Sequence, residues 1–353
     1  MSFTYGEKLK ITVFGQSHSK AIGIVIDNFP SGMKVDLENL EKFMSRRKPG
    51  GKFATKRCEE DEVEFLSGLN DKGETCGAPI CAIIKNKDVR SSDYENLKVL
   101  PRPSHTDLVS LYKYGESRDV RGGGSFSGRL TAPLCIAGAL CSQYLAEKGI
   151  KIGAHLYSVG SEKDIPYDSV NDEIPQNLSD FEVVSFDAKE KMQSLIERVR
   201  LDGDSVGGVI ECKATGVPVG LGDPTFDGVE NKISQIVFGV PAVKGIEFGS
   251  GFLGSEMLGS QNNDDYSVEN GKIRTVTNNA GGINGGITNG MPIIFKVALK
   301  PTPSIFKEQQ SVNLVELKEE KLTIKGRHDP CVAIRAVPVI ESVTSIVILD
   351  MLR

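Results

Sequence analysis

The sequence predicts an α+β protein in which buried central helices lie between β-sheets. Two segments carry this prediction: residues 128–148, in their first half, and residues 331–353 are apolar on nearly every side, which is typical of helices buried in a core. Stretches of alternating apolar and polar residues, beginning with Ile11 and Val13, supply the strands. No low-complexity linker interrupts the 353 residues, so we expect one large domain over residues 1–353.

The N-terminal part is expected to hold strands and one helix. Two strands, around residues 11–13 and 22–26, flank the segment GQSHS. Asp36 can cap a helix over LENLEKFMSRR, which ends before Pro49 and the two glycines after it. The stretches VEFL and PICAIIK have the pattern of further strands.

The remaining chain alternates between loops and regular elements. Residues 89–125 form a loop region too long to be structureless in a compact domain, and its Arg, His and Gly content favours a functional loop over a disordered one. In the C-terminal apolar segment, Pro338 predicts a kink or the N-terminal boundary of the helix. The other expected elements are helices at about 188–200 and 229–238 and strands near 205–216, 270–278 and 291–299.

Composition and charge exclude several classes of protein. The net charge of −5 argues against nucleic acid or an anionic membrane as the partner. The seven cysteines are odd in number and show neither CxxC nor metal-ligand spacing, so we expect reduced thiols and no metal centre. Because no signal peptide or membrane span is recognisable, we expect a cytoplasmic protein.

The four histidines differ in their surroundings. His18, His105 and His328 each lie on a turn beside a hydroxyl, a carboxylate or an arginine, and such loops are where functional groups concentrate. His155 lies in a strand-like segment and is interpreted as structural.

Arginine and lysine recur on glycine-rich loops of this acidic protein. They occur at residues 46–57, at Arg118, Arg121 and Arg129, and beside two histidines as Arg102 and Arg327. Guanidinium groups pair bidentately with phosphate and carboxylate, so this pattern predicts a pocket for a small polyanion. The alternative is a solvated basic helix end, which we favour for Lys48 and Lys56.

Three glycine-rich motifs have the composition of ligand-binding loops. The loop RGGGSFSG precedes a predicted helix and could present backbone amides to a phosphate, or be a flexible turn. The loop at residues 278–290 could let a flat ring or a phosphate lie against the main chain, or be a hairpin connection. The GxGxxG at residues 249–254 is followed by a polar loop rather than a helix, which disfavours a nicotinamide dehydrogenase.

Eight motifs together resemble the chorismate synthase family, in order and over essentially the whole chain. They are GQSHS, RRKPGGK with TKRCEED, RPSHTD, RDVRGGGSFSGRLT, PAVKGIEFGSGF, NNAGGINGGITNG, KPTPSI and GRHDPC. The resemblance implies a single layered β-α-β sandwich domain and a homotetramer. It also implies a lyase that removes phosphate from 5-enolpyruvylshikimate-3-phosphate by 1,4-anti elimination, giving chorismate. Reduced FMN would be required without net redox change.

The resemblance also implies roles for individual residues. His18 would protonate or stabilise the departing phosphate, and His105 would protonate the reduced flavin at its pyrimidine edge. Asp329, with Ser127 as a relay, would help the flavin N5 take the substrate's proton, while His328 would be a structural neighbour. Flavin contacts would fall on Ser125, Phe126, Ser127, Pro241, Ala242, Gly285, Lys300, Pro301, Thr302, Pro303, Ser304 and Arg327. The substrate's phosphate and carboxylates would be held by Arg47, Lys52, Arg102, Arg129 and Arg327.

Some positions depart from the family pattern. Here GQSHS replaces GESHG, GGGSFSGRLT replaces GGGRSSARET, and RPSHTD replaces RPGHAD. The alternative hypothesis is therefore a catalytically weakened paralogue that binds flavin or a phosphorylated metabolite as a sensor or structural partner. No reductase domain is recognisable, which favours an external flavin reductant over self-reduction with NADPH.

Overall fold

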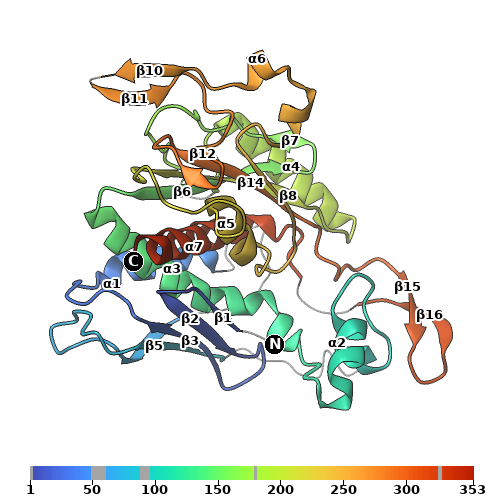
Figure 1. Cartoon of the computed structure of the whole chain (residues 1–353). Coiled ribbons are helices and arrows are strands. Elements are labelled where there is room, and N and C mark those ends of the chain that lie inside the picture. Colours follow the sequence, from blue (N-terminus) through green and yellow to red (C-terminus); the bar gives the residue numbers. More distant parts are fainter. Residues whose placement is uncertain (1–2, 49–60, 88–95, 179–180, 270, 325–327) are drawn as a thin grey trace.

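Two five-stranded antiparallel sheets enclose a layer of helices (Figure 1). The structure is a computed structural model that describes residues 3–48, 61–87, 96–178, 181–269, 271–324 and 328–353. The sequence-based prediction of an α+β fold with helices between sheets is confirmed.

The first sheet, lower in Figure 1, is built from the N-terminal part of the chain. Its strands are β1 (Thr4–Tyr5), β2 (Lys10–Gly15), β3 (Ala21–Asp27), β4 (Val63–Ser67) and β5 (Ile80–Lys85), in the order β1-β2-β3-β5-β4. Strand β3 is central, and its Ile22, Ile24 and Ile26 are wholly buried, as the alternating pattern predicts for a strand facing a core.

The second sheet, upper in Figure 1, comes from the second half of the chain. Its strands are β6 (Lys151–Val159), β7 (Glu162–Lys163), β8 (Gly208–Thr215), β9 (Val243–Phe248) and β14 (Ile293–Leu299), in the order β7-β6-β8-β14-β9. Strand β8 is central and buried along nearly its whole length.

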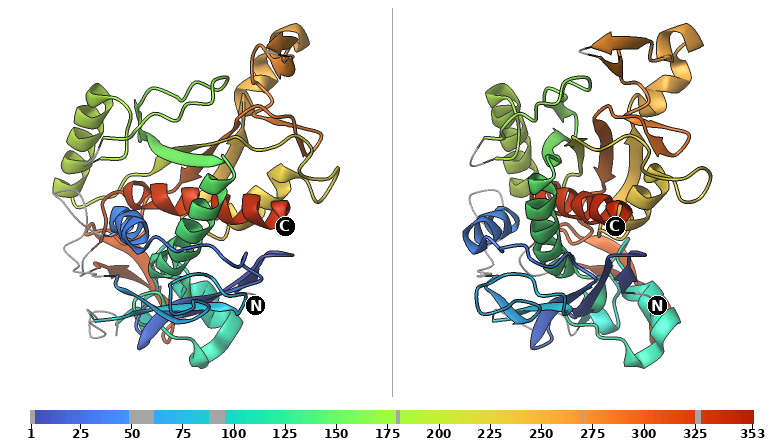
Figure 2. Two further views of the ribbon diagram at one scale, coloured as in Figure 1. Left: turned by 90° about the vertical axis from the view of Figure 1, so that its left-hand side faces the viewer. Right: turned by 60° about the vertical axis from the view of Figure 1, so that its left-hand side comes forward.

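The helices between the sheets are the most apolar of the chain. Helix α3 (Thr131–Glu147) packs on the lower sheet and α7 (Ala333–Leu352) on the upper one, and the two pack against each other. Helix α1 (Leu37–Arg47) completes this layer and is capped by Asp36, whose carboxylate accepts the backbone N–H of Asn39 at 2.9 Å. Figure 2 shows α7 and α3 crossing between the two sheets.

The end of α7 fastens the start of the chain. The carboxylate of Asp350 accepts hydrogen bonds from the backbone N–H groups of Glu7, Lys8 and Leu9, at distances down to 2.7 Å. The last helix and the turn before β2 are therefore joined across a sequence separation of 341 residues.

The remaining elements lie around the layers. Helix α4 (Phe186–Leu201) packs against β6 and β7, and α5 (Val229–Val237) against α7. The short elements are α2 (Asp107–Tyr114), α6 (Gly259–Asn262), and three two-stranded ribbons: β10 (Tyr266–Glu269) with β11 (Lys272–Thr275), β12 (Ile283–Asn284) with β13 (Ile287–Thr288), and β15 (Gln309–Asn313) with β16 (Lys318–Leu322). No helix in the described part of the chain has the length and apolar character that crossing a membrane requires.

Most of the predicted elements are present, with one boundary wrong. Pro338 lies inside α7, which begins five residues earlier at Ala333, so it does not mark the N-terminus of that helix. A proline in a helix removes one backbone hydrogen bond, and α7 nevertheless continues through it to Leu352. The long loop region also contains a helix that the sequence did not reveal, because α2 lies within it.

Candidate active site

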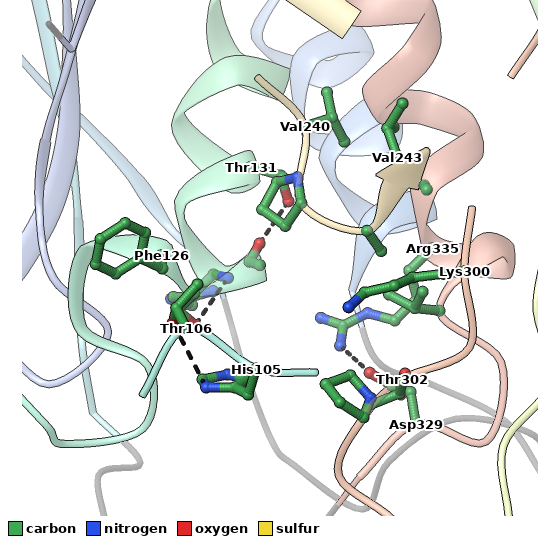
Figure 3. Close-up of a pocket in the computed structure, with 18 of the residues that line it drawn as sticks. His105, Thr106, Phe126, Thr131, Val240, Val243, Lys300, Thr302, Asp329 and Arg335 are labelled. Carbon is green, nitrogen blue, oxygen red and sulfur yellow. Dashed lines mark hydrogen bonds and ion pairs between the residues drawn. The ribbon is translucent and has the colours of Figure 1, made fainter. Parts of the chain in front are cut away.

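A cavity of about 580 Å³ lies where the loops between the layers meet. One side is formed by residues 102–106 and 122–131, which precede α2 and α3, and the other by residues 238–244, 300–304 and 329–339. Figure 3 shows His105, Thr106 and Phe126 facing Lys300, Asp329 and Arg335 across this space. The size falls within the range of small-molecule sites.

Positive charge dominates the lining. Six of the described lining side chains are Arg or Lys and one is a carboxylate, Asp329; the cations are Arg47, Arg102, Arg129, Lys244, Lys300 and Arg335. This excess of cations within an acidic protein suits a ligand that carries several negative charges.

Arg47 and Arg129 are held by one buried carboxylate. Arg47 is the last residue of α1, and its Nη1 donates to Asp61 Oδ2 at 2.9 Å while its Nε donates to the Thr131 hydroxyl at 3.0 Å. Arg129 also donates to Asp61, through its other oxygen, and to the Asn86 side-chain oxygen at 3.2 Å. Because the Asp61 side chain is fully buried, the two guanidinium groups are fixed in place before any ligand arrives.

Arg102 and His105 share a second carboxylate. Asp107, the first residue of α2, accepts from Arg102 Nε at 2.7 Å and Nη2 at 2.8 Å, and its Oδ1 lies 2.7 Å from His105 Nδ1. Burial would raise the pKa of the Asp107 carboxyl, but hydrogen bonds from Arg102 and His105 outweigh it and hold that pKa well below its ordinary value. Burial lowers the pKa of His105; Arg102 and Lys300 lower it further, and the bond to Asp107 opposes them.

The loop after β14 reaches across to this cluster. Lys300 Nζ donates to the Ser104 carbonyl at 2.7 Å, and Arg102 Nη1 donates to the Ser304 hydroxyl at 3.3 Å. These two bonds connect the loops on opposite sides of the cavity.

Asp329 is tied to the start of α7. Arg335 donates from Nη1 to Asp329 Oδ2 at 2.9 Å and from Nε to the backbone carbonyl of Arg47 at 3.1 Å. One guanidinium thus joins the only acidic group of the described lining to the end of α1.

One wall of the cavity is apolar. Val240, Val243, Ala336 and Val339 are nearly buried and line it together with Phe238, Pro241, Ala242 and Val332. A surface of this kind beside a row of cations fits a ligand with a flat apolar ring and an anionic tail.

The RGGGSFSG loop turns twice before α3. Residues 124–126 and 128–130 form two short 3₁₀ turns, and the Ser127 hydroxyl between them accepts the backbone N–H of Arg129 at 3.2 Å. Ser125, Phe126 and Ser127 all line the cavity, and Phe126 is 38% exposed.

His18 lies beside the cavity rather than in its lining. Its Nδ1 is 3.1 Å from the Ser17 hydroxyl, and its ring abuts Gly122, which does line the cavity. A side chain at position 122 would collide with this ring at about 2.5 Å, which explains the glycine there.

The structure brings most of the predicted site residues together. His105, Ser127 and Asp329 line the cavity, as do Arg47, Arg102, Arg129 and the expected flavin contacts at 125–127, 241–242, 300 and 302–304. Pro301 and Gly285 are not in the lining; Gly285 and Gly286, with φ of 60° and 89°, form the turn between β12 and β13. Lys52 and Arg327 lie outside the described residues. His328 lies outside the lining, with its ring centroid 5.8 Å from that of Phe306.

Sequence reasoning missed the residues that hold the site together. Asp61, Asp107 and the lining residue Arg335 were not predicted as site residues, although Asp107 stands two positions after His105. The short distance in sequence between His105 and Asp107, at the start of a helix, was the one signal that could have identified Asp107. Asp61 ends the motif TKRCEED, quoted together with the RRKPGGK that contains Arg47, but nothing in the local sequence says that its carboxylate pairs with Arg47 and Arg129.

The fold and the cavity define a class of protein with one small-molecule site that favours an anionic ligand, with cations on one side and an apolar wall on the other. Comparison with known proteins is more specific. The family model described as chorismate synthase matches residues 9–352. The chain is 44% identical to the chorismate synthase of Lancefieldella parvula, covering all of this chain and 96% of that protein. It is 44% identical to that of Cytophaga hutchinsonii (99% and 97% covered) and 42% identical to that of Korarchaeum cryptofilum (98% and 96% covered).

A solved structure agrees. It is titled a crystal structure of chorismate synthase and matches with a TM-score of 0.75 at 27% identity, covering 99% of this chain and 92% of the other. The chain therefore belongs to the chorismate synthase family.

Proposed function

We propose that the protein is a carbon–oxygen lyase that converts 5-enolpyruvylshikimate-3-phosphate to chorismate by 1,4-anti elimination of phosphate. The observation that carries the proposal is the match to the chorismate synthase family over residues 9–352, combined with one cavity that gathers His105, Ser127, Asp329 and three of the predicted arginines. The three relatives named above are all chorismate synthases, and nothing among them favours a weakened paralogue acting as a sensor.

The substrate carries a phosphate and two carboxylates, and the cavity offers matching groups. Arg47 and Arg129 are preorganised by the buried carboxylate of Asp61, and Arg102 by the partly buried carboxylate of Asp107, so they can bind these anions without first losing side-chain freedom. The departing phosphate gains negative charge as the C–O bond breaks, and fixed cations stabilise that charge. We assign the donation of a proton to this phosphate to His18, whose ring lies against Gly122 at the cavity edge.

The proton that leaves the substrate needs a base. Asp329, held by Arg335, presents the one carboxylate of the described lining, and the Ser127 hydroxyl on the opposite loop can relay a proton. Arg335 also orients Asp329, because the Nε of Arg335 is fixed by its hydrogen bond to the backbone carbonyl of Arg47.

Reduced FMN fits the described residues. The apolar wall around Val240 and Val339 suits a flat ring, and Lys300 with the 302–304 loop suits its polar edge and phosphate. When bound, reduced FMN supplies the electron density that makes this elimination possible without net redox change. We further propose that an external reductant keeps the flavin reduced in a cytoplasmic setting.

We also infer a homotetramer. An exposed apolar surface supports it: Tyr266, Val268 and Ile273 share one face of the β10–β11 ribbon and are 79%, 75% and 73% exposed. Phe252, Leu253 and Leu258 on the adjoining segment are also exposed. Apolar patches of this kind mark protein–protein interfaces.

The proposed function is tested by measuring chorismate formed from 5-enolpyruvylshikimate-3-phosphate by purified protein with chemically reduced FMN, without oxygen. Turnover with reduced FMN, and none with oxidised FMN, is the expected result. Flavin binding without turnover would instead favour the weakened paralogue. Ser125 and Phe126, which depart from the family pattern, line this same cavity.

A further inference from the structure

Asp107 lies behind the cavity and contacts two side chains that line it. It is the first residue of α2, where the helix dipole favours a negative charge. Its two oxygens receive Arg102 Nε at 2.7 Å, Arg102 Nη2 at 2.8 Å and the Arg102 backbone N–H at 3.0 Å, and Oδ1 faces His105 Nδ1 at 2.7 Å. Asp107 itself is absent from the lining.

This geometry determines where the His105 ring carries its proton. A carboxylate that is already bonded to a guanidinium is ionised and can only accept, so the Nδ1 atom facing it must carry a hydrogen. Nε2 is the other ring nitrogen, and within the described part of the chain it has no hydrogen-bond partner. Because His105 lines the cavity, Nε2 is the atom left for a ligand.

The charges around His105 oppose a second proton on the ring. Arg102 and Lys300 act on it as positive charges, Asp107 is the opposing negative charge, and the ring is largely removed from water. Burial, the largest of these effects, lowers the pKa of His105.

The same carboxylate sets the direction of the Arg102 side chain. Two of the three guanidinium nitrogens lie on Asp107, which leaves Nη1 to reach the Ser304 hydroxyl at 3.3 Å on the opposite loop. The Arg102 side chain is 3% exposed, so little room remains for another orientation.

We propose that Asp107 is a positioning residue that holds His105 as the neutral Nδ1–H tautomer, with the Nε2 lone pair facing the cavity, and fixes Arg102 beside it. This inference rests on the proposed function, since it assigns His105 a defined state in that reaction. His105 is then a hydrogen-bond acceptor in the resting enzyme. It can act as an acid only after it takes a proton from a bound group.

The tautomer is measurable without any activity. The chain has four histidines, so protein labelled with ¹⁵N-histidine gives few ring signals, and His105→Gln identifies those of His105. In wild-type protein near neutral pH we expect a protonated Nδ1 and an unprotonated Nε2. In Asp107→Ala we expect a shift toward the Nε2–H form. A doubly protonated ring or an Nε2–H tautomer in wild-type protein would overturn the proposal, whether or not the variant folds.

Kinetics separate positioning from a merely structural role. Asp107→Asn should lower kcat/KM by about 10- to 100-fold, with a raised KM from the freed Arg102, and should move the acidic limb of the pH profile to lower pH. Asp107→Glu keeps the charge and should recover part of the activity. Asp187→Asn, an exposed first-turn aspartate of α4, is the matched control and should leave kcat/KM unchanged.

The outcomes distinguish this proposal from the proposed function. If Asp107→Asn is only less stable, with the wild-type pH profile and kcat/KM, Asp107 has a structural role and the positioning proposal is wrong. If wild-type protein shows the expected tautomer but forms no chorismate, the proposed function fails and the placement of the proton on His105 stands.

Discussion

Ser104 occupies a backbone conformation that suits glycine better. Its φ is 57°, in the left-handed region, and its carbonyl accepts the Lys300 ammonium in the loop that carries Arg102 and His105. A non-glycine residue there costs about 1 kcal/mol or more. The family pattern RPGHAD places glycine at this position, so this chain tolerates a local strain that the family pattern avoids.

Ser104→Gly should therefore leave the free energy of unfolding unchanged or raise it by up to about 0.5 kcal/mol, because relief of strain exceeds the added entropy of the unfolded chain. Urea denaturation measures the difference. Ser110→Gly, inside α2 with ordinary helical geometry, is the control and should lose about 1 kcal/mol. Equal losses in the two variants would show that φ at residue 104 carries no strain.

At the residue scale, the sequence predicted the side chains that line the cavity more completely than the side chains that hold them in place. His105 and Arg102 stand out in RPSHTD because their types are chemically active and their surroundings are turn-like. Asp61 and Arg335 have roles that depend on which segments fold against each other: Asp61 is 14 residues from Arg47 and 68 from Arg129. The apolar wall was missed as a feature from the residues alone, because valines and alanines are equally typical of an ordinary core.

At the scale of elements, helices α3 and α7 approach each other very closely at Gly138 and Ser342. A Cβ atom at Gly138 of α3 would lie 2.2 Å from the Ser342 Cβ and 2.3 Å from its Cα. The two backbones are thus nearly touching at this point, which a larger residue would prevent.

Gly138→Ala should lower the free energy of unfolding by about 1–2 kcal/mol, since overpacking outweighs the better helix propensity of alanine. Thermal or urea unfolding checks this. Adding Ser342→Gly should recover only part of the loss, because the main chain of residue 342 would still collide with the new methyl group. Gly259→Ala, where the new Cβ meets nothing within 4 Å, is the control and should not destabilise.

The second element-scale feature joins β6, β8 and the start of α4. His155, directly opposite Glu211 in the sheet, is fully buried between two carboxylates: its Nδ1 is 3.1 Å from Asp164 and its Nε2 is 3.0 Å from Glu211. Asp164 also accepts the backbone N–H groups of Val184 and Ser185. Burial lowers the pKa of His155, but bonds to both carboxylates outweigh it and raise that pKa overall. The interpretation of His155 as structural agrees with this placement.

A raised pKa gives the stability a defined pH dependence. The contribution of charged His155 is fully present below its unfolded pKa, near 6.5, and is lost as the pH rises through the higher folded value. His155→Gln should cost about 3–5 kcal/mol near pH 6, because it leaves the buried Asp164 without its cation and Glu211 with only Lys296, at 3.7 Å. The difference in the free energy of unfolding between the variant and wild type should become smaller toward pH 9, as measured by urea denaturation at a series of pH values. A gap that widens with pH would contradict a charged His155.

Elements were predicted correctly where a segment followed a single pattern of apolar residues, either the alternation of a strand or the spacing of a helix. The strands β2 and β3 and the Asp36 cap of α1 follow from local pattern alone. Pro338 misled because the local rule against proline in helices is overridden when a helix is packed on all sides, as α7 is. Ribbons such as β15–β16 carry little apolar signal, so the sequence did not reveal them.

At the scale of the whole molecule, one connected cluster of buried apolar side chains runs from the lower sheet through α3 and α7 into the upper sheet. We infer a single domain over residues 1–353 from this continuity. The β10–β11 ribbon projects from that body, as Figure 2 shows, and has one apolar and one polar face.

Introducing a charge on the apolar face should disrupt assembly. We expect Val268→Lys with Ile273→Lys to reduce the molar mass measured by light scattering after gel filtration, because burying these charges in an interface is costly. Glu269→Lys lies on the opposite, polar face of the same ribbon and should keep the wild-type mass. An unchanged mass for the double variant would place the interface elsewhere.

The position of α7 has a consequence for how the protein is made. The helix that fills the space between the sheets is synthesised after the strands of both sheets, and its Asp350 holds the backbone of Leu9, 341 residues earlier in the chain. Synthesis runs from the N-terminus at about 5–20 residues per second, so α3 and the strands β6 and β8 must wait many seconds for the helix that packs against them. Changes that weaken α7 should therefore reduce the yield of correctly folded protein more than the stability of the molecules that do fold. A bound chaperone during translation should rescue that yield.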